Sequence, residues 1–156
     1  MSGLFKNAVN ISHQVIAAVV EAGDIVVDAT CGRGHDTIFL AQLVGEKGKV
    51  YAFDIQGIAI ETTWELLQAN KTLENVVLIK DNHSNLDSYI PQRIKACMFN
   101  LGYLPGGDHS IKTDKVNTLK ALEKATKMLD NNGVITIVFY PGHSGGQEEL
   151  NSMMVY

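Results

Sequence analysis

The sequence feature that most constrains the fold is an alternation of short apolar runs with longer amphipathic stretches. Five apolar runs have the length of buried strands, and they lie at 25–29, 50–54, 76–79, 96–99 and 134–139. The amphipathic stretches between them have the spacing of helices. Strands joined by helical crossovers predict an α/β protein with a doubly wound, mainly parallel sheet.

The helix ends are predicted from capping residues and from glycine. Trp64 and Met98 are expected in the core. The predicted helices run from a Ser12 cap to about Ala22, from an Asp36 cap over 37–44, over 58–70, over 85–90, and from an Asp114 cap to about Leu129.

Composition narrows the class of protein. The 156 residues are 46% hydrophobic and 19% charged, which is ordinary for one globular domain spanning 1–156. No apolar run approaches the roughly 20 residues of a membrane span, and we see no signal peptide. The two cysteines form no CxxC pair, so we expect no zinc site and a reducing, cytoplasmic location. The net charge of −4 argues against a dedicated nucleic-acid binder, although it leaves a local basic patch open.

A glycine turn follows the first predicted strand. Gly32 and Gly34 allow the backbone to turn tightly and to approach a ligand. Asp54 ends the second predicted strand, 20 residues after Gly34, where a carboxylate can accept the hydroxyl hydrogens of a ribose. Ligands of such sheets bind at the carboxyl ends of the strands. The pattern therefore predicts a nucleoside cofactor.

Two details favour S-adenosylmethionine over NAD. A dinucleotide fingerprint would place a small residue at position 37, where this chain has Thr37. Asp28 precedes the turn, and a carboxylate there suits the cationic amino-acid end of S-adenosylmethionine better than a pyrophosphate. We expect the segment from Asp28 to Asp36 to hold this methyl donor.

Four motifs resemble a known protein family. They are Asp28-Ala29-Thr30-Cys31-Gly32-x-Gly34-His35-Asp36-Thr37, Phe53-Asp54-Ile55-Gln56, Phe99 to Asp108, and Tyr140-Pro141-Gly142-His143. Together they look like the class I methyltransferases long described as putative rRNA methylases, a family associated with methylation of the amine of 5-aminomethyl-2-thiouridine at the tRNA wobble position. The resemblance extends over nearly the whole chain.

The resemblance implies a Rossmann-like fold and a set of donor contacts. Two positions depart from the family pattern: Arg33 stands where Asn is usual, and His109 stands where Lys is common and can contact phosphate. The implied donor contacts are Gly32, Arg33, Gly34, Asp54, Gln56, His83 and Ser84.

The acceptor side is predicted around the end of the fourth strand. The carbonyl of Asn100 can accept a hydrogen bond from an amine, and the ring of Tyr103 can stack on an extruded base. Leu104, Tyr140 and His143 are further candidates for acceptor contacts. The proton acceptor is left open among water and Asp108, His109 and His143.

Class I methyltransferases usually add two strands after the fifth, whereas this sequence ends at Tyr156. We therefore expect a sheet that lacks those strands, with the chain a C-terminally truncated fragment or the sheet completed differently. A homodimer would be one way to cover the edge of the fifth strand. The predicted partner is the anticodon region of tRNA. Small-molecule methylation, a non-enzymatic nucleoside-binding module and an NAD-dependent oxidoreductase remain alternatives.

Overall fold

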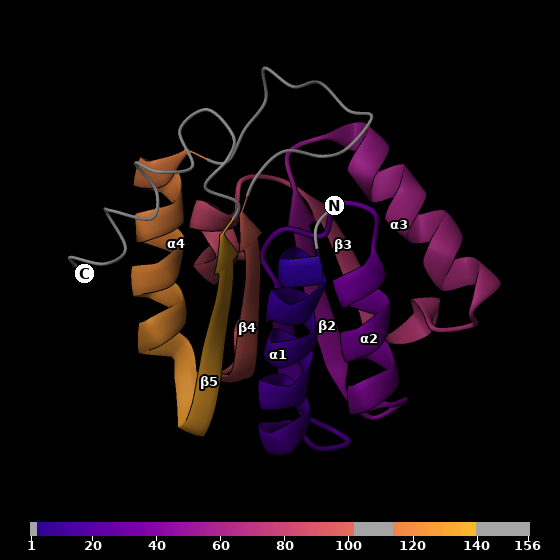
Figure 1. Ribbon diagram of the computed structural model, residues 1–156, viewed down its shortest axis with the longest axis horizontal. Coiled ribbons are helices and arrows are strands. Elements are labelled where there is room, and N and C mark those ends of the chain that lie inside the picture. The colour runs from indigo at the N-terminus through magenta and orange to yellow at the C-terminus, as the bar shows by residue number, and fades with distance from the viewer. Residues whose placement is uncertain (1–2, 102–113, 140–156) are drawn as a thin grey trace.

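The computed structural model describes residues 3–101 and 114–139. Its elements follow the order expected for a doubly wound sheet, with helical connections between successive strands (Figure 1). In chain order they are α1 (Gly3–Val19), β1 (Ile25–Asp28), α2 (His35–Val44), β2 (Lys49–Asp54), α3 (Gly57–Ala69), η1 (Leu73–Asn75), β3 (Val76–Lys80), η2 (His83–Ser88), β4 (Ile94–Leu101), α4 (Lys115–Met128) and β5 (Leu129–Phe139).

The five strands form one sheet in the order β3-β2-β1-β4-β5, and every pair is parallel. This confirms the predicted α/β class and gives the Rossmann-like arrangement that the resemblance implied. The chain adds β2 and β3 on one side of the central strand β1 and then β4 and β5 on its other side, so the strand order reverses at β1. The carboxyl ends of all five strands lie along one edge of the sheet.

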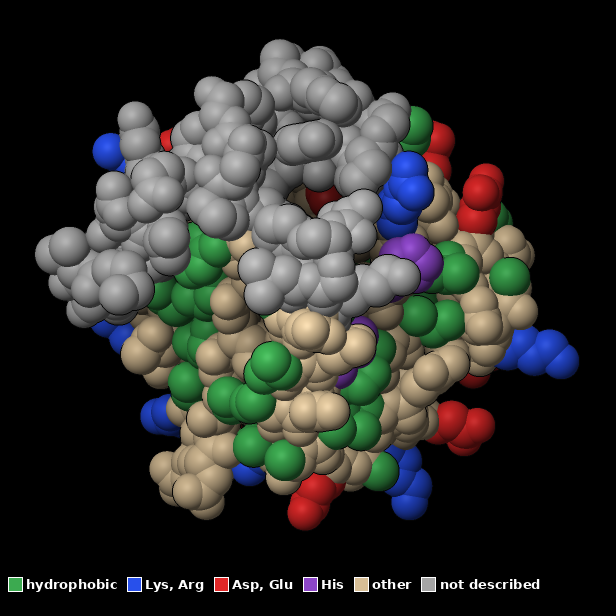
Figure 2. Space-filling model, in the orientation of Figure 1, with side chains coloured by type: hydrophobic (Ala, Val, Ile, Leu, Met, Phe, Trp, Pro, Cys, Tyr) green, Lys and Arg blue, Asp and Glu red, His purple; other side chains and the backbone are tan. Residues whose placement is uncertain are grey.

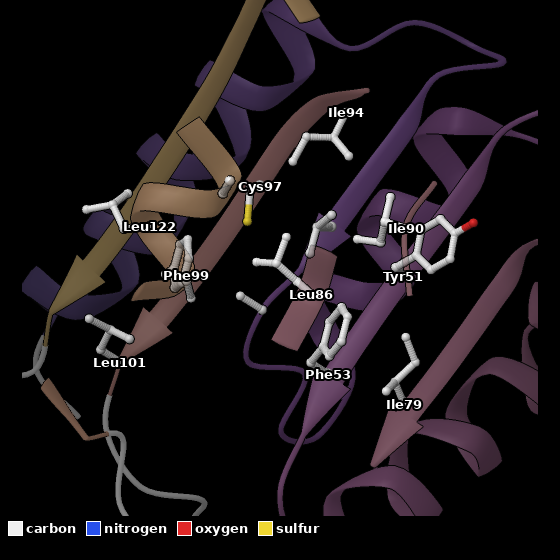
Figure 3. Close-up of a cluster of buried hydrophobic side chains, with 14 residues drawn as sticks. Tyr51, Phe53, Ile79, Leu86, Ile90, Ile94, Cys97, Phe99, Leu101 and Leu122 are labelled. Atoms are coloured by element: carbon white, nitrogen blue, oxygen red, sulfur yellow. The ribbon is translucent and has the colours of Figure 1, made fainter. Parts of the chain in front are cut away.

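Alternating strand residues create two separate cores. On one face, Val26, Val50 and Met98 pack under α1, α2 and α3. On the other face, Phe53 and Phe99 pack under η2 and α4, as Figure 3 shows for the side chains around Leu86. This alternation follows from the two-residue period of a strand, and it explains why the central strands are apolar on both faces.

Three local predictions are wrong. Ser12 caps no helix, because α1 begins at Gly3 and Ser12 lies inside it, buried and donating a 2.8 Å hydrogen bond to the Thr136 hydroxyl. Asp36 is also inside a helix, since α2 begins at His35 with Gly34 as its N-cap. Trp64 is 44% exposed, because α3 turns Ala59, Thr63 and Leu67 toward the sheet.

Two other local predictions, on Asp114 and on Met98, are confirmed. Asp114 caps α4 and accepts a hydrogen bond from the Val116 amide, and Met98 is buried. Among the described helices, none is long and apolar enough to cross a membrane. Within the same residues, no group of three His, Cys, Asp or Glu side chains is placed to hold a metal ion.

Candidate functional site

The glycine turn between β1 and α2 lies at the carboxyl edge of the sheet and is held in a left-handed conformation. Gly32 has φ 53° and Gly34 has φ 89°. Gly34 also lies so close to α3 that an added Cβ would be 3.0 Å from the side-chain atoms of Thr63. A side chain at position 34 would therefore strain the backbone and collide with α3.

Asp54, at the end of β2, is bonded directly to this turn. Its Oδ2 accepts a 3.0 Å hydrogen bond from the Gly32 amide, and its Oδ1 accepts one of 3.0 Å from the Gln56 amide. A carboxylate has about four acceptor positions, so each oxygen can accept a further hydrogen bond. Burial raises the pKa of Asp54, an effect that these two amides oppose. The structure thus brings together the acid and the glycine turn that the sequence placed 20 positions apart.

Asp28 lies beneath the turn and is completely buried. Its Oδ1 accepts from the Thr30 amide at 3.1 Å, and its Oδ2 accepts from the Thr37 hydroxyl at 2.6 Å. Burial, helped by the nearby charge of Asp36, raises the pKa of Asp28 to about 7. Asp28 therefore fixes the start of the turn to α2, while its direct contact with the donor stays a prediction.

Asp36 occupies the first turn of α2 and is buried. Its Oδ1 lies 2.5 Å from Nε2 of His13, a residue of α1. An acid in this position also interacts favourably with the helix dipole. The predicted contact between Asp36 and the donor likewise stays a prediction, because this oxygen already has a partner within the protein.

The segment after β3 reaches the same edge. The Nδ1 atom of His83 lies 2.9 Å from the Ala29 carbonyl oxygen, so this nitrogen carries a hydrogen and donates. The imidazole meets the Phe99 ring edge to face, and burial lowers the pKa of His83. Ser84 is buried, and its amide donates to the Asn82 side chain. His83 and Ser84 are thus placed beside the end of β1.

Asn100 lies near the end of β4 and is partly exposed. Its backbone amide donates a 2.7 Å hydrogen bond to the Thr30 hydroxyl, which joins this acceptor-side candidate to the glycine turn. Two other donor-side candidates lie at this edge: Arg33 is exposed, and Gln56 is buried. Outside the described residues lie Tyr103, Leu104, Asp108, His109, Tyr140 and His143.

Sequence reasoning missed the contributions of two threonines. Thr30 joins Asp28 to Asn100 through its amide and hydroxyl. Thr63 is fully buried under the turn, and its hydroxyl donates to the Gly32 carbonyl at 3.1 Å. The signal for Thr63 was a polar residue spaced four positions from both Ala59 and Leu67, on the buried face of a helix.

Comparison with known proteins places this site in a family. Residues 50–156 match the family described as Putative rRNA methylase. A tRNA (mnm(5)s(2)U34)-methyltransferase, chloroplastic, from Arabidopsis thaliana is 44% identical over 155 residues, covering 93% of this chain. The chain spans 57% of the length of that relative.

Solved structures agree over almost the whole chain. A putative rRNA-methylase from Clostridium thermocellum is 50% identical with a TM-score of 0.93, covering 95% of this chain and 80% of that one. A putative methyltransferase from Streptococcus mutans in complex with SAH is 36% identical with a TM-score of 0.86, covering 95% of this chain and 79% of that one. The chain therefore belongs to the Putative rRNA methylase family of class I S-adenosylmethionine-dependent methyltransferases.

Proposed function

We propose that this chain binds S-adenosylmethionine at the carboxyl edge of the sheet and transfers its methyl group to an amine of tRNA. The observation that carries the donor site is the pair of hydrogen bonds that Asp54 accepts from the amides of Gly32 and Gln56. It places the remaining acceptor positions of one carboxylate beside the glycine turn, where they suit the two hydroxyls of a ribose. The S. mutans relative, solved with SAH, supports the same ligand class.

The donor-binding residues in this proposal come from several segments of the carboxyl edge. The turn contributes backbone groups of Gly32 and Gly34, with Arg33 beside them, and Asp28 and Asp36 stand behind the turn. Asp54 and Gln56 follow β2, and His83 and Ser84 follow β3. When bound, S-adenosylmethionine supplies the methyl group and leaves as S-adenosylhomocysteine.

On the acceptor side, we assign Asn100 to orienting the amine. The backbone amide of Asn100 donates to the Thr30 hydroxyl, so the residue is held against the turn near the end of β4. The side-chain carbonyl of Asn100 can accept a hydrogen bond from a neutral amine, which aims the nitrogen lone pair and favours in-line displacement through positioning. The methylated nitrogen then releases one proton, to water or to one of Asp108, His109 and His143. Tyr103, Leu104, Tyr140 and His143 remain proposed acceptor contacts.

The finer assignment, a wobble 5-aminomethyl-2-thiouridine in the anticodon region, rests on the Arabidopsis relative. In the view of Figure 2 the described Lys and Arg side chains stand apart from one another and form no single basic patch on that face. Phosphate contacts would then come from separate cations. Two candidates are the exposed lysines of α4, Lys115 at its first position and Lys120 further along it. The cytoplasmic location and a homodimer contact on β5 remain predictions.

Titration calorimetry with S-adenosylmethionine tests the donor site. Asp54→Ala should weaken binding by at least about 100-fold, because it removes two hydrogen bonds to a charged group, each worth about 1.5–3 kcal/mol. Asp130→Ala is the matched control, since Asp130 is an exposed aspartate near the amino end of β5, away from the turn. Equal affinities of the two variants would contradict the assignment of Asp54.

A methyl-transfer assay tests the acceptor. We expect transfer from S-adenosylmethionine to tRNA that carries the aminomethyl group, and none to tRNA that lacks it. Asn100→Ala should lower kcat with little change in donor affinity, because it removes an interaction with the amine alone. Equal transfer to both tRNAs, or turnover of a small amine with no transfer to tRNA, would overturn the tRNA assignment.

A further inference from the structure

A contact between α1 and α2 lies next to the glycine turn, at the start of α2, and it involves His13, which has been given no role in donor binding above. Nε2 of His13 donates to Oδ1 of Asp36 at 2.5 Å. The same imidazole stacks on the ring of Phe39, with centroids 3.9 Å apart and planes inclined by 3°. Two residues of α2 therefore contact the His13 side chain, one through a hydrogen bond and one through ring stacking.

This contact lies at the end of α2 that follows the glycine turn. Asp36 belongs to the first turn of α2, and Gly34, the N-cap of that helix, has no side chain with which to cap it. Asp36 is buried, and its side chain is only 9% exposed against 26% for His13. A buried carboxylate requires a hydrogen-bond partner, and among the described residues His13 supplies the one to Oδ1.

Two hydrogen bonds fix the start of α2 to two different elements. The Thr37 hydroxyl bonds to Asp28 and so joins α2 to the end of β1. The Asp36 carboxylate bonds to His13 and so joins α2 to α1, which is itself held on the sheet by the hydrogen bond from Ser12 to Thr136. The turn that we assign to the donor leads directly into these two residues of α2.

We propose that His13 is a positioning residue for the methyl donor, acting through Asp36 to hold the glycine turn in its donor-binding conformation. The inference rests on the proposed function of the turn. It predicts that loss of the His13 hydrogen bond weakens donor binding, while the chemical step is almost unchanged because His13 lies on a helix behind the turn.

Two substitutions separate the halves of the contact. His13→Phe preserves a ring to stack on Phe39 but cannot donate to Asp36. His13→Gln preserves a donor to Asp36 but has no ring. Gln14→Ala is the matched control, since Gln14 is the next residue on α1 and is exposed.

In titration calorimetry of the full chain, His13→Phe should weaken S-adenosylmethionine binding by about tenfold, the scale of one charge-assisted hydrogen bond. His13→Gln should recover most of that loss, and Gln14→Ala should bind like the wild type. In the transfer assay the KM for S-adenosylmethionine should rise in His13→Phe by a similar factor, with kcat changed by less than about twofold.

A double-mutant cycle with Asp36→Ala, which removes the acceptor of the hydrogen bond, tests whether His13 acts through Asp36. The double variant should bind the donor no more weakly than the weaker single variant, because both remove the same hydrogen bond. Wild-type affinity in His13→Phe, or fully additive losses, would overturn the inference alone. Absence of donor binding by the wild type would overturn the proposed function and this inference with it.

Discussion

Substitution of Gly34 by alanine should destabilise the protein through two separable effects. The first is backbone strain, because Gly34 has φ 89° and an L-residue in left-handed conformation costs about 1–2 kcal/mol. The second is a collision, because the new Cβ would lie 3.0 Å from two Thr63 side-chain atoms and 3.1 Å from the Thr63 backbone at its α-carbon. Because that carbon is part of the main chain of α3, rotation of the Thr63 side chain cannot relieve the collision.

Gly23 provides a control that isolates the collision. It has φ 95°, close to that of Gly34, yet an added Cβ would meet nothing within 4 Å. Gly23→Ala should therefore lower the free energy of unfolding by about 1–2 kcal/mol, through strain alone. Gly34→Ala should lower it by about 1–3 kcal/mol more, which is the range for overpacking. The loss of unfolded-state entropy is common to both substitutions and cancels in the comparison.

Urea titration followed by tryptophan fluorescence measures both variants. The chain has a single tryptophan, Trp64, which follows Thr63 on α3 and reports on the helix that the substitution displaces. The free energy of unfolding is obtained by linear extrapolation, with an unchanged slope expected for both variants. Equal destabilisation by Gly34→Ala and Gly23→Ala would refute the close approach of the turn to α3. Donor binding should weaken in Gly34→Ala and remain unchanged in Gly23→Ala.

Two further predictions concern charge. The pKa of Asp28 is raised to about 7 in the folded protein. Between about pH 4 and pH 7 the folded state therefore keeps a proton on Asp28 that the unfolded state has released. The stability that this group confers falls as the pH rises through that range. Urea titrations across that range should show the wild type losing stability relative to Asp28→Asn, and a constant difference between the two would contradict the raised pKa. Lys124 donates to the Ser84 carbonyl at 2.6 Å and to Asp87 at 2.7 Å, so Lys124→Met should lower the free energy of unfolding by about 1 kcal/mol. Thermal denaturation checks this against the exposed control Lys120→Met, and equal melting temperatures would argue against the Lys124 hydrogen bonds.

The sheet and its functional edge were predictable because they depend on local pattern and general topology. Four of the five apolar runs contain two or more β-branched or aromatic residues, the run at 96–99 is short and apolar throughout, and helical crossovers leave a parallel sheet as the consistent arrangement. Parallel strands end at one edge, so Asp54 was expected near Gly32 without knowledge of any distance. The 3.0 Å hydrogen bond between them agrees with that reasoning.

The errors arose where a distant partner decides the role of a side chain. Ser12 and Asp36 are good N-cap residues in isolation, but their side chains bond to Thr136 and His13 on other elements. Trp64 was expected in the core, although α3 presents a different face to the sheet. Because one sequence carries no direct record of such pairings, the His13 contact could be found only from the three-dimensional structure.

The hydrogen bond between Ser12 and Thr136 has a consequence for how the chain folds. It joins residues 124 positions apart, near the two limits of the described chain. Contacts of such large sequence separation carry a high loop-closure entropy and slow folding. During synthesis α1 is the first of the described helices to emerge, and it can reach its α2 partner early. The strand β5 that it packs against exists only after Phe139 has been made, so this early helix is among the last to complete its contacts.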